Sequence, residues 1–465
     1  MYNSKFIQIY QSLSLEELRG LRKWFNVYFV NKNDAEYKLF EFIESRRNIT
    51  ELSVNKERAF QYLFKQKKYD DLKMRHIMWL TTEVIEDFLA YHTFRKKRNL
   101  EKLQLLSAYQ KKNLPLFTKE TIDEIQKSSN KKQLLDSEYY YEQFVIEKEK
   151  YELATRNTRI ATLNIQTLLD TFHHYMISEL LKWSCIAFSD QRISNINYEI
   201  PTLQPILQLI EDGKYDEIPS IQVYYLVYKT LKQEQESDFK KLIETVYKYE
   251  KHFTETELKD VFLLCINYCI RKLNQSDLLY AEKAFELYLH AIGKKYFIEN
   301  NELSRFSFSN IVSIGIKLKE FKKTENFIEQ HQQYINNDFR ENTVSFNLSK
   351  VWYAQKLYKK AMPTLLQTEF KDVIWNLNAK HLLLKMLYET QEIEILQSNL
   401  ISFKSYILRQ KKIGYHKDFF LQIIQQFHQL IKYYFATKRD KTILKNEILE
   451  NKKLQDKDWL LSVLS

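Results

Sequence analysis

The N-terminal quarter of the chain alternates apolar stripes of helical period with short polar breaks. Ser14 and Glu17 have capping-box spacing and precede such a stripe, which predicts that a helix begins there. The polar stretch 31–34 ends this helix. A longer stripe follows over residues 70–94, and another helix is predicted over 100–111. The apolar positions of the long stripe are Met74, Ile77, Met78, Thr81, Ile85 and Phe88.

The middle of the chain reads as a few long helices. Pro115 marks a break, and helical patterns then run through residues 118–188. One stripe lines a single side of a helix at Ile165, Leu168, Leu169, Phe172 and Met176. Residues 189–201 are rich in Asn and Ser and show little periodicity, so we predict a long connection there.

From about residue 202 onward the pattern becomes a series of helix pairs. Each pair is joined by a short polar turn, such as Gly213 to Ile218, and an aromatic or aliphatic anchor marks each turn. Four successive anchors are separated by 43, 37 and 35 residues: Leu278, Phe321, Tyr358 and Ile393. A unit of that length, two helices long, is typical of a helical solenoid, in which stacked neighbours bury a shared core. Thr254 and Glu257 form a second capping box ahead of a helix that is apolar on nearly all sides.

Composition strengthens this picture. The 465 residues include five Gly and five Pro, about 2% together against roughly 12% in an average protein, alongside 32 Tyr and 30 Phe. No Asn-Gly or Asp-Gly turn lies between alternating apolar residues, so we expect no sheet. The predicted fold class is all-α, divided into an N-terminal helical block (1–112), a long-helix connector (113–200) and helical repeats (201–465). Trp459, Leu460 and Leu461 are predicted to close a last helix that caps the stack.

One repeat unit, residues 345–373, resembles the tetratricopeptide repeat (TPR). The positions that carry the likeness are Leu348, Ser349, Trp352, Tyr358, Ala361 and Leu365. In an earlier unit, Cys269, Ala281 and Phe285 match its small, Ala and large positions. The chain departs from the family in that the Gly of the pattern is replaced and Val373 stands where its closing Pro would be. The resemblance covers roughly residues 202–437.

The whole chain also resembles a group of uncharacterised bacterial helical proteins with an N-terminal helical block before degenerate repeats. The TPR-like repeats imply protein or peptide binding, not catalysis.

Several features bear on localisation. The N-terminal residues lack the pattern of a signal peptide. The densest apolar run, Val261 to Ile270, is too short to span a membrane and is followed by two basic residues. Cys265 and Cys269 lie inside this run and are expected to be buried thiols from a reducing compartment. We therefore expect a soluble, cytoplasmic protein without a membrane partner.

The net charge of +11 is concentrated near the N-terminus, where residues 1–112 hold 22 basic and 14 acidic side chains. The basic runs are Arg46-Arg47, Lys65-Gln66-Lys67-Lys68, Arg95-Lys96-Lys97-Arg98 and Arg409 to Lys412. Such runs could neutralise the phosphates of a nucleic acid. The simpler interpretation is solvated helix ends, where cations meet the negative end of the helix dipole.

Few side chains in the sequence are arranged for metal binding, catalysis or phosphate binding. Cys265 and Cys269 share a helix face but lack the further ligands of a structural zinc site. His173 and His174 lack the spacing of a helical zinc pair, and His428 lies beside the apolar stripe of residues 420–427. The carboxylate cluster Glu83, Glu86 and Asp87 is interpreted as solvated helix positions. The scattered glycines permit no phosphate loop and no Gly-x-Ser-x-Gly elbow.

These observations predict a non-enzymatic scaffold or adaptor that binds a protein or peptide on the concave face of a helical superhelix. We predict no catalytic, cofactor-binding or metal-binding residues and no cofactor, and the partner-binding residues are unknown. The Tyr and Phe side chains are either interhelical core or contacts in a peptide groove. The alternative function is a regulator whose basic block binds nucleic acid while the repeats sense a peptide. A third reading, an unusual helical enzyme, rests on the carboxylate cluster alone. The oligomeric state, the pathway and the partner's identity do not follow from the sequence.

Overall fold

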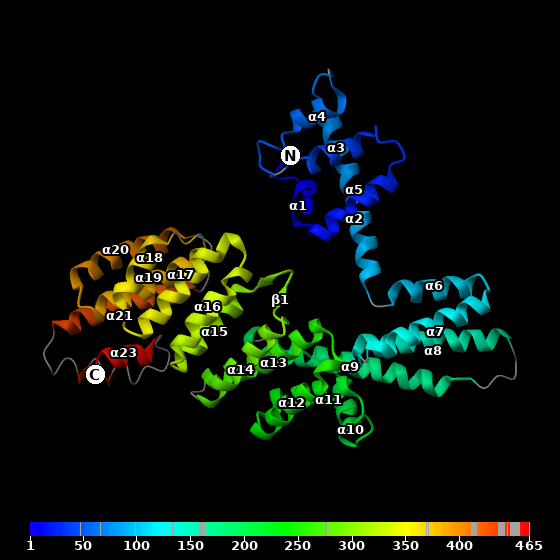
Figure 1. Cartoon of the computed structure of the whole chain (residues 1–465). Helices are drawn as coiled ribbons and strands as arrows, with labels where there is room; N and C mark the ends of the chain where they lie inside the picture. Colours follow the sequence, from blue (N-terminus) through cyan, green and yellow to red (C-terminus); the bar gives the residue numbers. More distant parts are fainter. Residues whose placement is uncertain are drawn as a thin grey trace. The chain divides into compact units, whose positions relative to one another are not determined.

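The computed structural model is almost entirely helical (Figure 1). It describes residues 1–46, 48–65, 67–97, 99–132, 134–157, 163–194, 196–274, 277–368, 370, 372–410, 416–435, 442–443, 445–446 and 456–464. The predicted all-α fold class is confirmed for these residues, which contain 22 α-helices and one short hairpin. The chain divides into two compact units. The first comprises Met1–Gln133 and Glu138–Tyr175, and the second Leu134–Ser137 and Met176–Ser465.

The first unit begins with five helices around one aromatic-rich core. They are α1 (Lys5–Ser12), α2 (Leu15–Tyr28), α3 (Ala35–Glu44), α4 (Lys56–Phe64) and α5 (Asp71–Lys96). The capping box at Ser14 and Glu17 is formed in both directions and starts α2 as predicted. All six apolar positions of the predicted long stripe on α5 are buried, including Met74 and Ile85 at 0% exposure. The 3.6-residue period therefore identified the core face of α5 correctly.

Four helices continue the chain: α6 (Leu100–Lys111), α7 (Pro115–Lys132), α8 (Ser137–Asn157) and α9 (Ile165–Ser194). Pro115 is the first residue of α7, where its missing N–H costs nothing. The predicted connection over 189–201 is wrong at its start, because α9 continues to Ser194. Three members of the predicted α9 stripe, Ile165, Leu169 and Phe172, are exposed.

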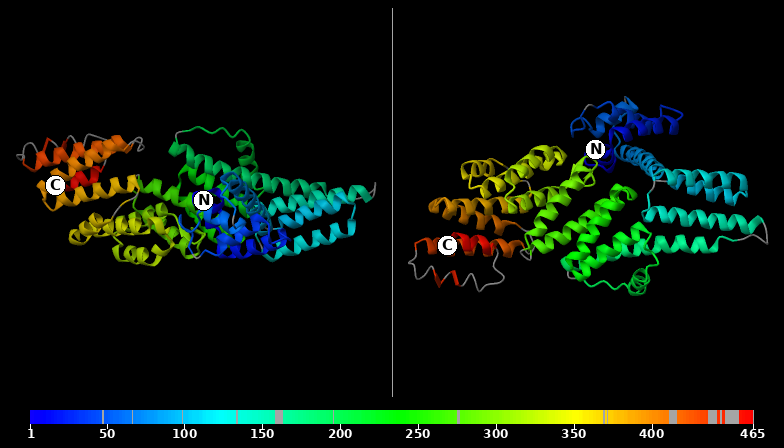
Figure 2. Two further views of the ribbon diagram at one scale, coloured as in Figure 1. Left: turned by 90° about the horizontal axis from the view of Figure 1, so that it is seen from above. Right: turned by 60° about the horizontal axis from the view of Figure 1, so that its bottom comes forward.

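The second unit is built mainly from consecutive helix pairs. Its helices are α10 (Leu203–Glu211), α11 (Pro219–Gln233), α12 (Glu236–Tyr249), α13 (Glu255–Asn274), α14 (Leu279–Gly293), α15 (Arg305–Lys317), α16 (Phe321–His331), α17 (Asn337–Ala354), α18 (Tyr358–Gln367), α19 (Val373–Glu389), α20 (Ile393–Arg409), α21 (His416–Tyr434) and α23 (Lys457–Val463). Each odd-numbered helix from α11 to α19 packs against the even-numbered helix that follows it. Figure 2 shows α15 to α21 lying side by side from two further directions.

The predicted anchors have the same structural role in successive pairs. Phe321, Tyr358 and Ile393 are the first residues of α16, α18 and α20. Three residues after each of the four anchors comes a side chain with 0% exposure: Ala281, Thr324, Ala361 and Leu396. Seven residues after each comes a second buried side chain: Phe285, Ile328, Leu365 and Leu400. The repeat found in the sequence therefore corresponds to a repeated register of burial.

The expectation of no sheet is wrong at one place. Two short antiparallel strands, β1 (Ile298–Glu299) and β2 (Glu302–Leu303), form a hairpin in which Ile298 pairs with Leu303. The turn is Asn300-Asn301, and both residues have positive φ (50° and 64°). Asn tolerates this left-handed conformation, so an Asn-Asn pair supplies the turn that Asn-Gly usually makes.

The two units have separate cores. The first unit buries the side chains of α1 to α5 in one cluster and those of α6 to α8 in a smaller one. The second unit has a large core from α9 to α17 and another from α18 to α23. The division by compactness falls inside α9, whereas the division by sequence pattern falls at 112 and 200. The three-segment scheme stays a prediction about organisation along the chain.

Candidate binding site at the C-terminal repeats

The odd-numbered helices of the second unit are linked to one another by polar bridges. Between α11 and α13, the Tyr224 hydroxyl donates to Glu257 at 3.1 Å. Between α15 and α17, Asn347 Nδ2 donates to Ser309 Oγ at 2.9 Å, and Lys350 Nζ donates to Ser313 Oγ at 2.6 Å. These hydrogen bonds connect neighbouring odd-numbered helices, and the one between Tyr224 and Glu257 is buried.

The next bridge, from α17 to α19, is centred on the carboxylate of Glu389. One oxygen accepts hydrogen bonds from the Tyr353 hydroxyl and from Trp459 Nε1, the latter at 2.7 Å, and the other oxygen accepts from the Tyr358 hydroxyl. Burial and this carboxylate raise the pKa values of Tyr353 and Tyr358. Both tyrosines therefore stay protonated and act as donors to an anionic group.

A second polar cluster lies on α19 at Lys385 and His381, four and eight residues before Glu389. Asp456, the residue before α23, places a carboxylate oxygen 2.8 Å from Lys385 Nζ and 3.1 Å from His381 Nε2. Burial alone would raise the pKa of Asp456, but His381 and the Lys385 cation outweigh it and hold this pKa well below the ordinary value. Burial lowers the pKa of His381, so at neutral pH the ion pair is that of Asp456 with Lys385.

Beside these clusters lies an open hollow of about 730 Å³, which we call the tyrosine hollow. It is lined by Lys356, Tyr358, Tyr388, Glu389, Gln391, Tyr433, Tyr434, Ser462 and Val463. Four phenol rings, one cation and one carboxylate make a surface suited to a peptide, because phenols supply both apolar area and hydrogen bonds. Its walls come from two repeat turns, from the end of α21 and from α23.

An adjoining hollow of about 710 Å³ lies over the start of α18. It is lined by Lys356, Leu357, Tyr358, Lys359, Lys360, Met362, Pro363, Thr390 and Glu392. Lys356 and Tyr358 belong to both hollows. The turn between α17 and α18 therefore forms a shared border of the two.

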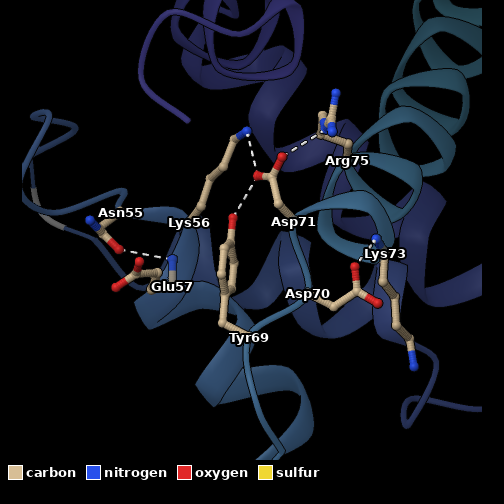
Figure 3. A network of polar contacts seen from close by, with 8 residues as sticks. All are labelled: Asn55, Lys56, Glu57, Tyr69, Asp70, Asp71, Lys73 and Arg75. Carbon is tan, nitrogen blue, oxygen red and sulfur yellow. Dashed lines mark hydrogen bonds and ion pairs between the residues drawn. The ribbon is translucent and has the colours of Figure 1, made fainter.

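Two cations of the N-terminal block that lie outside the basic runs, Lys56 and Arg75, share one carboxylate. Figure 3 shows Lys56, Tyr69 and Arg75 pointing toward the carboxylate of Asp71, at 3.1, 2.7 and 2.9 Å. The Asn55 side chain accepts from the Glu57 N–H, and Asp70 accepts from the Lys73 N–H, so these residues begin α4 and α5. The network thus fixes the junction of two helices.

Some members of the predicted runs also have acidic, aromatic or carbonyl partners. The Arg46 guanidinium lies 4.1 Å from the Phe42 ring, and Arg95 pairs with Glu101 at 3.0 Å. Lys67 lies over the Phe64 ring, and Arg409 donates to the Ser405 carbonyl. Arg47, Gln66, Arg98, Lys411 and Lys412 lie outside the described residues.

Cys265 and Cys269 are buried in α13 at 1% and 0% exposure. Burial raises the pKa of Cys265 to about 12 and also raises that of Cys269, so both are protonated thiols at neutral pH. Cys185 is buried as well and donates to the Tyr224 carbonyl. Within the described part of the chain, no group of three or more His, Cys, Asp or Glu side chains could hold a metal ion.

The predicted histidines and carboxylates do not converge. His173 and His428 are exposed, and His174 packs edge-on against the Tyr140 ring. Glu83 and Asp87 are exposed on α5, and Glu86 forms an ion pair with Lys5 at 2.5 Å. The structure therefore brings none of these groups to the tyrosine hollow.

Sequence reasoning missed the acceptor and the charges of the candidate site. Glu389, Lys385, His381 and Asp456 are ordinary polar positions in the sequence, and 70 residues separate Glu389 from Trp459. The sequence pattern singles out Tyr358, as a repeat anchor, and Trp459, as part of a closing helix. The sequence feature that could have indicated this site is an acidic residue, Asp456, three positions before Trp459 at the start of a short helix.

Comparison of the chain with protein families, curated proteins and solved structures gives no match in any of the three. Among the described residues, no helix is long and apolar enough to cross a membrane.

Proposed function

We propose that the protein is a non-enzymatic adaptor that binds a segment of a partner protein along the face formed by its odd-numbered helices. The observation that carries this proposal is the repeated register of the helix pairs, with its polar bridges between successive odd-numbered helices. Stacked pairs of this kind present one extended face, which is the binding surface of helical repeat proteins. We further propose that these pairs form a TPR-like superhelix, in keeping with the sequence resemblance.

The proposed face includes side chains that can grip a peptide. On α17, Phe346, Lys350 and Tyr353 follow one another at helical spacing and are each partly buried. The Lys350 ammonium lies 5.7 Å from the Phe346 ring, and it also reaches α15 through Ser313. An aromatic ring beside a lysine offers an apolar contact and a counter-ion for a partner carboxylate.

The direct test is site-specific photocrosslinking in the full-length protein. A photoreactive amino acid in place of Lys350 is expected to capture a defined protein partner. The same residue in place of Lys322, which is exposed on α16, is expected to capture much less of it. Equal capture at both positions, or capture at neither, would contradict the proposal.

A second candidate function is nucleic-acid binding by the basic N-terminal block, favoured by the excess of eight basic residues in positions 1–112. Several of these cations already have acidic or aromatic partners, so we rank this function second. Nucleic-acid binding through phosphates weakens steeply with salt. Tight, salt-sensitive retention of DNA or RNA by the full-length protein, without crosslinking at position 350, would reverse this ranking.

A further inference from the structure

The helix α23 is held against α19 and α21 by apolar contacts. The Trp459 ring lies 5.4 Å from the Phe427 ring and 6.1 Å from the Tyr388 ring, measured between centroids. Leu460 and Leu464 are buried at 1% and 6% exposure. A seven-residue helix is marginal alone in water, so these contacts stabilise it in place.

Polar groups fix the orientation of α23 in this position. Its preceding residue, Asp456, reaches Lys385 and His381, while the indole N–H of Trp459 reaches Glu389. The Lys385 ammonium also lies 5.0 Å from the Trp459 ring. At its other end, the carbonyl of Leu464 accepts from the Tyr433 hydroxyl at 3.2 Å. Asp456 therefore meets a cation, Trp459 meets a hydrogen-bond acceptor, and the side chains of Leu460 and Leu464 are buried.

One of the receiving groups, the Glu389 carboxylate, is also held by residues outside α23. Glu389 is fixed by the Tyr353 and Tyr358 hydroxyls, which come from α17 and α18. Lys385 and His381 lie on α19 together with Glu389. The tyrosine hollow extends the same surface, and α23 contributes only Ser462 and Val463 to its lining. The surface under α23 is thus a prepared site for a short peptide segment.

We infer that this surface is a ligand site of the adaptor and that α23 occupies it as an internal ligand. The partner segment that it accepts carries an acidic residue three positions before a tryptophan, with leucine after the tryptophan. This inference rests on the proposed function and adds the partner's chemistry and its regulation. A partner binds only after displacing α23, which competes at the high effective concentration of an attached segment.

The experiment uses a fluorescent peptide with the sequence of residues 456–464 and the full-length protein, followed by fluorescence anisotropy. Wild type is expected to bind it weakly, because α23 fills the site. Trp459→Ala is expected to bind it roughly tenfold tighter or more, since its own helix no longer competes well. Trp183→Ala removes an exposed tryptophan on α9 and is expected to behave like wild type.

Two further variants keep the test decisive if Trp459→Ala does not fold. Asp456→Lys places a cation beside Lys385 and releases α23 without removing a core side chain. Lys385→Glu in this background restores an opposite-charge pair with Lys at position 456, so it is expected to return α23 to its site and to restore the weak peptide binding of wild type. Circular dichroism establishes that each variant is folded.

Equal peptide binding by wild type and both release variants, or none by folded release variants, overturns the inference. Photocrosslinking at position 350 tests the proposed function independently of peptide binding. If that crosslink persists while peptide exchange fails, the adaptor stands and only the internal-ligand inference falls. If the peptide exchanges without the crosslink, the inference stands and the face around Lys350 is not the partner's site.

Discussion

At the scale of single residues, burial and local charge decide which polar groups have unusual chemistry. Glu257 on α13 is 4% exposed, and its carboxylate accepts from the Tyr224 hydroxyl. Burial, together with the Asp136 carboxylate, raises the pKa of Glu257 to about 7, although Lys182 and Tyr224 oppose this. The capping box predicted for this residue forms only in part. The Glu257 N–H donates to Thr254 Oγ1, while the Glu257 side chain contacts α11.

Glu257 is expected to make stability depend on pH. Its folded-state pKa is higher than its unfolded value, so its contribution is fully present below about pH 4.5 and is lost as pH rises through about 7. The loss amounts to up to about 3 kcal/mol. Glu257→Gln should therefore gain stability relative to wild type between pH 5 and pH 8, as measured by urea unfolding.

The matched control is Glu255→Gln, an exposed position in the first turn of the same helix. It should leave the pH profile of wild type unchanged. Parallel profiles for wild type and Glu257→Gln would show that Glu257 does not titrate in this range.

At the scale of elements, successive helix pairs use the same turn. Two residues after the last residue of α15, α17 and α19 comes a residue of positive φ, namely Lys319, Lys356 and Gln391. In each case the next N–H bonds a carbonyl five residues earlier, as Glu320 does to Gly315 at 2.9 Å. This is the Schellman helix ending, in which Gly is the preferred residue. The motif is not recognisable in the sequence, because Lys and Gln stand at the position where Gly is usual.

Glycine at such a turn should stabilise the fold. A side chain in the left-handed region costs about 1–2 kcal/mol, and glycine loses part of that gain through its freedom in the unfolded chain. Lys319→Gly is therefore expected to raise the free energy of unfolding by about 0.5–1 kcal/mol.

Lys241→Gly, an exposed lysine inside α12, tests the same change in ordinary helical conformation. It should lower the free energy of unfolding by about 1 kcal/mol. A loss of stability in both variants would mean that Lys319 is not strained.

At the scale of the whole molecule, two units with separate cores should unfold in distinguishable steps. Each unit contains a glycine whose replacement by alanine would crowd a buried neighbour. At Gly315 a Cβ would lie 2.1 Å from Thr324 Oγ1, and at Gly20 it would lie 3.0 Å from the Phe88 ring.

Calorimetry should therefore show two transitions that respond separately. Gly315→Ala is expected to lower the free energy of unfolding of the second unit by about 1–3 kcal/mol, and so the temperature of its transition. Gly20→Ala is expected to destabilise the first unit by less. Gly293→Ala lies at the end of α14, where a Cβ meets nothing within 4 Å, and it should lower neither transition. A single transition that all three variants shift equally would contradict two independent units.

Most helices, the buried face of α5 and the repeated register of burial could be predicted from the sequence, because a helix brings residues three and four apart onto one face. The buried stripe of α5 and the positions three and seven residues after each anchor follow from this local periodicity. The contacts of Trp459 with Glu389 and of Asp456 with Lys385 became visible only in the folded chain. Those pairings join positions about 70 residues apart. They depend on how packed helices are placed in space, and this placement leaves no periodic trace in the chain.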